Sequence, residues 1–140
     1  ANVVADFHGY NVNCFSGGTE ITACNERTIA SFERMGFTLL NPGGENPHYE
    51  LSYHENKTPI VLFSKIYNDF TNPKNNFAAV MTCSHADKNC PFIPGSDKRI
   101  ALPYEDPKAA DDTPKEAETY DERSLQIAAE MKYVFCDLLG

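Results

Sequence analysis

The chain has 140 residues, of which 41% are apolar, and a formal net charge of −8. This length fits one compact domain with a buried core but not two. The negative charge and the lack of a Lys/Arg cluster argue against nucleic acid or an anionic membrane as a partner. Because no apolar stretch approaches the roughly 20 residues that cross a bilayer, and no basic segment leads into an apolar run at the start, we expect a cytoplasmic protein.

The first part of the chain predicts two helices with a strand between them. Residues 1–7 space their apolar side chains as a helix does, and Gly9 follows where a helix typically ends. Residues 11–16 alternate like a short strand. Asn25 is the expected N-cap of the second helix, which carries its own apolar stripe.

The rest of the chain predicts a hairpin, two more strands and a closing helix. Residues 48–67 read as two strands joined by a polar turn, and the apolar run 77–82 is typical of a central parallel strand that is buried on both faces. Residues 99–102 form a shorter strand candidate, and Thr113 is the expected cap of a long helix. The apolar stripe of that helix consists of Leu125, Ala128, Met131, Phe135 and Leu138. We therefore expect one α/β domain over residues 1–140, with the hairpin as an insert.

The segment CSHADKNCP, directly after the apolar strand, has the richest chemistry. Ligands of open α/β sheets bind at the carboxyl ends of strands. Cys83 and Cys90 could form a disulfide if the loop between them turns, and His85 or Lys88 would raise the thiolate fraction. Two buried, inert cysteines fit the same pattern. A zinc site would lack the second ligand pair that structural sites normally have, so no metal or cofactor is predicted.

Asp106 is a candidate general acid, because it stands before Pro107 in a loop that follows a strand. An Asp-Pro pair is also a common turn. The other cysteines, Cys14, Cys24 and Cys136, fall in strand or helix patterns, where cysteine behaves as a small hydrophobe. No chemistry is predicted for them.

Taken in order, these segments resemble the low-molecular-weight protein tyrosine phosphatase family, and within it the thioredoxin-coupled arsenate reductases. The likeness is carried by Ser16–Glu20, Asn25–Arg27, Cys83–Pro91 and Glu105–Pro107. It spans nearly the whole chain apart from the hairpin, and the spacing of Cys83 and Cys90 is its most specific part. The resemblance implies a parallel sheet of strand order 2-1-3-4 flanked by helices, with residues 11–16 as strand 2 and residues 77–82 as strand 3.

The resemblance also implies a nucleophilic cysteine in a Cys-x5-Arg-Ser loop, which binds an oxyanion through backbone N–H groups and the Arg. Neither Cys14 nor Cys24 is followed six residues later by Arg. We therefore expect strand 1 and the loop to lie before Ala1, and this chain to be inactive without them. The gap would leave buried backbone groups unpaired, at about 1–3 kcal/mol each. A strand from the missing segment, from the hairpin, or from a second chain in a strand-exchanged homodimer is expected to fill it.

In such a reductase, arsenate would form an adduct with the nucleophilic thiolate, and attack by Cys83 on that sulfur would release arsenite. Cys90 would resolve the resulting disulfide, and thioredoxin would reopen the Cys83–Cys90 bond. Asp106 matches the family's general acid. Two alternatives remain. A low-molecular-weight protein tyrosine phosphatase acting on phosphate esters needs the nucleophile, the Arg and the Asp but not the thiol pair, and a catalytically silent binding module fits the absence of the loop.

Overall fold

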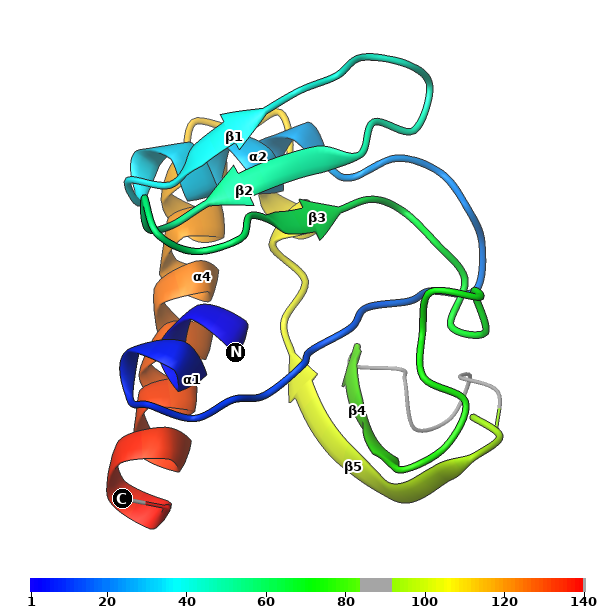
Figure 1. The fold of residues 1–140 in the computed structure, drawn as a ribbon. Coiled ribbons are helices and arrows are strands. Elements are labelled where there is room, and N and C mark those ends of the chain that lie inside the picture. Colours follow the sequence, from blue (N-terminus) through cyan, green and yellow to red (C-terminus); the bar gives the residue numbers. More distant parts are fainter. Residues whose placement is uncertain (84–91, 140) are drawn as a thin grey trace.

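The computed structural model describes residues 1–83 and 92–139, and it has a mixed α/β fold (Figure 1). The helices are α1 (Asn2–Phe7), α2 (Glu26–Arg34), the 3-10 helix η1 (Pro107–Ala110), α4 (Glu116–Lys132) and its π-helical continuation η2 (Tyr133–Leu138). An antiparallel sheet contains β1 (Thr38–Leu40), β2 (Tyr49–Ser52) and β3 (Ile60–Leu62). A separate parallel pair contains β4 (Phe77–Cys83) and β5 (Ser96–Tyr104).

The predicted hairpin forms, and its first strand, β2, is the centre of the antiparallel sheet. Leu51 lies opposite Leu39 of β1 on one side and Ile60 of β3 on the other. Tyr49 and Leu51 are buried, and α2 packs against this sheet through β1. The short strand β1 was not predicted, because three residues are too few to show a period. The hairpin therefore belongs to a small sheet of its own and does not lie beside β4.

The helices pack around α4, which contacts α1 and α2 (Figure 1). Ser31 of α2 is completely buried, and its Oγ donates a hydrogen bond to Oδ1 of Asp121 at 2.6 Å. Arg34, one turn further along α2, forms an ion pair with the same carboxylate at 2.8 Å. Phe135 is buried beside the ring of Tyr10. These contacts hold the helical part of the molecule together.

The predicted start of α4 at Thr113 is wrong. The helix begins at Glu116 with Lys115 as its N-cap. The Thr113 hydroxyl, two residues before that cap, donates to the carbonyl of Ala110 at 2.6 Å and accepts the backbone N–H of Lys115 at 3.3 Å. The predicted apolar stripe is confirmed only in part, because Phe135 is buried whereas Leu125 and Leu138 are exposed. Neither α4 nor another helix within residues 1–83 and 92–139 is long and apolar enough to cross a membrane.

The strand β4 is parallel to β5, as predicted, but it is not buried on both faces. Ala79 and Met81 pack on one face with Phe77 and Ile93. On the alternate positions Val80 remains 48% exposed. Within the described residues β4 has β5 as its one strand neighbour, so it is an edge strand rather than a central one. The sequence could not distinguish an edge strand from a central strand here, because a run of apolar residues fits both.

The predicted strand at residues 11–16 does not form. This segment is exposed and runs across the molecule to Gly18, which makes a single parallel bridge with Ile66. Gly17 approaches Tyr67 so closely that a Cβ would lie 2.5 Å from the Tyr67 Cα, so only glycine fits there. The segment is therefore anchored beside the chain that leaves β3, and among the described residues nothing occupies the place of a strand between it and β4.

We predict that Leu51→Ala lowers the free energy of unfolding by about 2–5 kcal/mol, because it leaves a cavity in the buried face of the antiparallel sheet. Val61 is the matched control, since it lies on the adjacent strand with 51% of its surface exposed. Val61→Ala should change that free energy by no more than about 0.5 kcal/mol. Urea denaturation followed by circular dichroism measures both, and equal losses would contradict this packing.

Candidate functional site

The carboxyl ends of β4 and β5 meet at one edge of the parallel pair. β4 ends at Cys83, β5 ends at Tyr104, and these two residues are register partners. Asp106 follows two residues after Tyr104, in the loop that leaves this edge. The parallel direction of the strands therefore brings the backbone of Cys83 and the Asp106 loop to the same side of the sheet, where open α/β sheets bind ligands.

The second predicted thiol lies outside the described residues. Cys90, together with His85 and Lys88, falls within residues 84–91, and only the backbone of Cys83 is described. The disulfide between Cys83 and Cys90 and the weaker zinc alternative both depend on these residues. The thiol pair therefore stays a prediction from the sequence.

Asp106 is exposed and begins a turn of helix. Its Oδ1 accepts a hydrogen bond from the backbone N–H of Lys108 at 3.0 Å, which caps η1, and Pro107 occupies the first position of that helix. The Asp-Pro pair thus forms a turn, which is the structural alternative that the sequence left open. The same capping bond limits the orientations of a solvent-accessible carboxyl group, which is a requirement for proton transfer to a bound substrate.

The end of β5 is tied to α4 through Tyr104. Its hydroxyl donates to Oε2 of Glu130 at 2.5 Å. Loss of hydration on burial, followed by this bond to Glu130, raises the pKa of Tyr104 to about 12, so the phenol stays protonated at neutral pH. Arg123 of α4 lies 3.6 Å from the carboxylate of Glu105, and its buried Nε has no hydrogen-bond partner among the described atoms. On this side of the Asp106 loop, Arg123 therefore lies beside Glu105 with its side chain 20% exposed.

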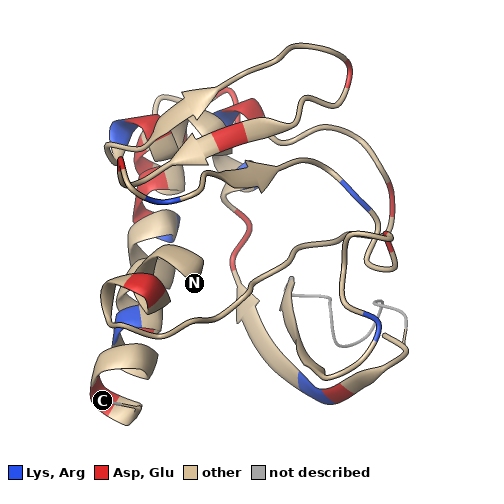
Figure 2. Cartoon of the chain, viewed as in Figure 1, with Lys and Arg blue, Asp and Glu red and all other residues tan. Residues whose placement is uncertain are grey.

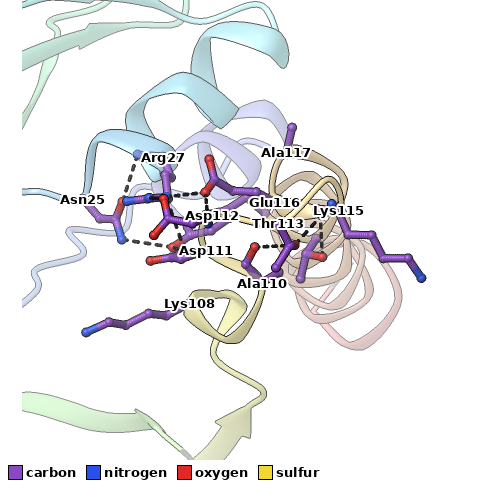
Figure 3. A network of polar contacts seen from close by, with 12 residues as sticks. Asn25, Arg27, Lys108, Ala110, Asp111, Asp112, Thr113, Lys115, Glu116 and Ala117 are labelled. Carbon is purple, nitrogen blue, oxygen red and sulfur yellow. Dashed lines mark hydrogen bonds and ion pairs between the residues drawn. The ribbon is translucent and has the colours of Figure 1, made fainter.

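The other side of the loop is held by Arg27, at the start of α2 (Figure 3). Arg27 Nε donates to Oε2 of Glu116 at 2.7 Å, and Nη2 donates to Oδ1 of Asp112 at 2.8 Å. Asp111 is 3.5 Å away. Asn25 positions this arginine, because its Oδ1 accepts the backbone N–H of Arg27 at 2.9 Å and caps the helix as predicted. One guanidinium thus connects α2, α4 and the segment that follows η1.

Tyr120 is the buried member of this polar network, with 4% of its surface exposed. Its hydroxyl donates to Oδ1 of Asp111 at 2.8 Å and accepts a hydrogen bond from Nδ2 of Asn25 at 3.0 Å. Burial, and then the bond to Asp111, raise the pKa of Tyr120. The hydroxyl therefore acts as a neutral bridge between the start of α2 and the end of η1.

The charges of the network reinforce one another. The hydrogen bond with Arg27, followed by the one from the Asp112 N–H, lowers the pKa of Glu116, and the bond to Glu116 raises the pKa of Arg27. Asp112 has a φ of +60°, a left-handed conformation that Asp tolerates better than most residues. Its N–H donates to Glu116 at 2.7 Å, which holds the bend in place. The path of the chain after Asp106 is therefore determined by these contacts.

This network was not predicted from the sequence. Asn25 was assigned only its capping function, and Arg27 was noted only for the family resemblance. A weak signal was present, because Asp111, Asp112 and Glu116 form an acidic cluster just before a helix. Such a cluster does not reveal its partner, since Arg27 is 89 residues from Glu116 in the sequence.

The three cysteines outside the predicted pair differ in exposure. Cys14 and Cys136 are exposed, so the expectation that they act as small core hydrophobes is wrong. Cys24 is half-buried, and burial raises the pKa of its thiol. A smaller fraction of Cys24 is therefore in the reactive thiolate form than for a cysteine with the ordinary pKa.

The structure has two shallow hollows away from the sheet edge. One of about 220 Å³ lies between α2 and the antiparallel sheet, and one of about 200 Å³ lies between α1 and the hairpin. Asp106 lines neither of them. Within residues 1–83 and 92–139, no group of three His, Cys, Asp or Glu side chains could hold a metal ion.

Comparison with known proteins assigns no family to this chain. No model of a known protein family matches it, and no curated protein sequence matches it. The sheet edge and the polar network beside it are therefore the observations on which a function can be based.

We predict that Tyr120→Phe lowers the free energy of unfolding by about 1–2 kcal/mol, because Asp111 and Asn25 lose a buried hydrogen-bond partner while the ring stays in place. Tyr133→Phe is the control, since Tyr133 is 55% exposed. It should change the same quantity by less than about 0.5 kcal/mol. Urea denaturation at neutral pH distinguishes the two, and a neutral Tyr120→Phe would mean that the bridge contributes no net stability.

We also predict that the free energy of unfolding depends on pH through the ionisation of Glu116. Its pKa in the folded protein lies below the usual 4.5, so its stabilising contribution is complete above pH 4.5 and is lost as the pH falls through the lower folded value. The stability difference between the wild type and Glu116→Gln should therefore shrink as the pH falls from about 5 to about 3. Urea denaturation at several pH values measures it.

Glu122→Gln is the control for this titration. Glu122 is exposed on the same helix, and no ion pair or hydrogen bond of its side chain occurs in the described part of the chain. Its difference from the wild type should stay constant over the same pH range. A constant difference for Glu116→Gln as well would show that the Arg27 pair does not stabilise the fold.

Proposed function

We propose that this chain carries the disulfide-forming part of an arsenate reductase with the low-molecular-weight phosphatase fold. Cys83 and Cys90 are the thiol pair, and Asp106 is the general acid. The observation that supports this most is the parallel pairing of β4 with β5, because it brings the Cys83 strand end and the Asp106 loop to one sheet edge. A redox thiol and a proton donor need such a shared edge to act on one substrate.

The proposed reaction moves two electrons from the protein to arsenic. A nucleophilic thiolate displaces water from arsenate and forms a sulfur–arsenic(V) bond, with Asp106 supplying a proton to the leaving oxygen. The Cys83 thiolate attacks that sulfur, so a disulfide forms and arsenite leaves with the electron pair. Cys90 then attacks Cys83 and releases the nucleophile as a thiolate. Thioredoxin, a dithiol, reduces the Cys83–Cys90 disulfide and is itself oxidised.

Residues 1–140 hold no Cys-x5-Arg loop, so the oxyanion step needs a loop from outside these residues. In the proposed fold, β4 and β5 correspond to strands 3 and 4 of the family sheet, and α4 with η2 corresponds to the closing helix. The chain by itself is therefore expected to neither reduce arsenate nor hydrolyse phosphate esters. The exchange of the thiol pair with thioredoxin is the part of the cycle that these residues can perform alone.

We predict that mild oxidation of the chain forms a Cys83–Cys90 disulfide and that thioredoxin reopens it. Mass mapping of the oxidised peptides identifies the bond, and NADPH consumption in the presence of thioredoxin and its reductase measures the reopening. Cys83→Ser and Cys90→Ser should each abolish both signals. Cys136→Ser is the control, because this exposed thiol lies at the far end of the chain, in η2, and should leave both signals unchanged.

Other results separate the alternatives. If Cys83 and Cys90 both remain free thiols after oxidation of the chain, the proposed disulfide cascade is ruled out. In a protein that also carries the oxyanion loop, arsenate reduction that disappears in both serine variants supports the reductase. Hydrolysis of a phenyl phosphate that survives both variants supports a phosphatase instead. If the protein shows neither arsenate reduction nor phosphate hydrolysis, and Asp106→Asn gives the same result in both assays as the wild type, the result supports a silent binding module.

A further inference from the structure

β4 is an uncharged edge strand. Its seven residues, FAAVMTC, contain neither a charged side chain nor a proline, and among the described residues only β5 pairs with it. An edge of this kind presents unpaired N–H and C=O groups to any extended chain that can lie alongside it. Natural sheets usually protect such edges with charges, prolines or bulges.

The neighbouring strand carries the protection that β4 lacks. β5 contains Asp97, Lys98, Arg99 and Pro103. Figure 2 shows this contrast, with charged residues along the lower part of β5 and none on β4. Because both strands belong to one small sheet, the difference indicates that the β5 side faces solvent and that the β4 side meets another strand.

The open face of the same sheet is apolar beside this edge. Val80 and Ile100 are register partners, and they remain 48% and 40% exposed. The opposite face is covered, because Ala79 and Met81 pack against Ile93. Parallel sheets are normally covered on both faces, and a two-stranded sheet is rarely stable alone. A strand added beside β4 would cover the flank of Val80 that now lies at the edge.

We propose that β4 pairs with β4 of a second copy of this chain, antiparallel, about a two-fold axis at Val80. Val80 is the middle of Phe77–Cys83, so this register pairs all seven residues. An axis perpendicular to the sheet keeps equivalent faces on the same side, so both copies place Val80 and Ile100 on one continuous surface. The result is a four-stranded sheet with β5 at each outer edge.

Charge favours pairing through β4 over pairing through β5. Two copies with a net charge of −8 each repel one another, and the repulsion is smallest where the contact has no charges. β4 meets that condition, whereas pairing through β5 would place Asp97, Lys98 and Arg99 in the interface. A seven-residue edge buries less than the roughly 1,200–2,000 Å² of stable complexes, so we expect a weak dimer. This inference concerns residues 1–140, and it is an alternative to the family sheet proposed above, in which strand 1 would lie beside β4.

The oligomeric state of residues 1–140 tests the proposal. Sedimentation velocity over about a hundredfold range of concentration should show a reversible monomer–dimer equilibrium. Val80→Lys places two like charges at the axis and should weaken the dimer at least about tenfold. Val61→Lys is the matched control, because Val61 is equally apolar, 51% exposed and on the edge strand β3. A monomer at every concentration, or equal weakening by both variants, would overturn the proposal.

Amide hydrogen exchange of the wild type locates the interface without any substitution, and one variant then checks the assignment. In the wild type, the alternate β4 amides that do not bond to β5 should become protected as the concentration rises. Ala78→Lys, on the same exposed face, should remove that protection while leaving the thermal midpoint of the dilute monomer unchanged. A dimer whose protected amides lie outside β4, or β4 amides already protected in the dilute monomer, would show that another strand occupies this edge.

Discussion

The arrangement of this molecule depends on Arg27 and the carboxylates that surround it. This one side chain, in the first turn of α2, connects Glu116 at the start of α4 with Asp112 in the bend after η1. Tyr120 adds a buried neutral bridge to Asp111. These contacts join the loop that follows β5 to α2, which lies some 80 residues earlier in the sequence. The local sequence alone would not bring these two segments together.

The network also determines how the candidate site is held. The loop that carries Asp106 leaves the parallel sheet and enters the network within one short helix, so its far end is fixed to α2 and α4. Tyr104, at its near end, is bound to Glu130 of α4. The candidate acid is thus supported on both sides by the helical part of the molecule, while Cys83 belongs to β4, whose main contacts are with β5. A reaction at this edge would therefore use one residue from the parallel strand pair, Cys83, and one from the loop that the helices support, Asp106.

Local patterns predicted the helices and the hairpin well. Asn25 caps α2 because its side chain and the N–H it bonds are two residues apart, and the polar turn within residues 48–67 needs only its own sequence. The patterns failed where the partner is distant. Residues 11–16 alternate like a strand but have no strand beside them in the described part of the chain, and Thr113 closes a turn onto Ala110. A strand needs a neighbour for its backbone hydrogen bonds, and a propensity cannot supply one.

The sequence by itself determined the helices α1, α2 and α4, the hairpin, the parallel strand that ends at Cys83, and the position of Asp106 after the next strand. It also determined the spacing of Cys83 and Cys90, on which the proposed function depends. Only the tertiary structure decided that β5 is the one strand beside β4 among the described residues, that Val80 is exposed, and that Arg27 holds the loop. The physical reason is that capping, turns and periodicity act over a few residues, whereas burial, strand neighbours and ion pairs depend on residues that only the fold brings together.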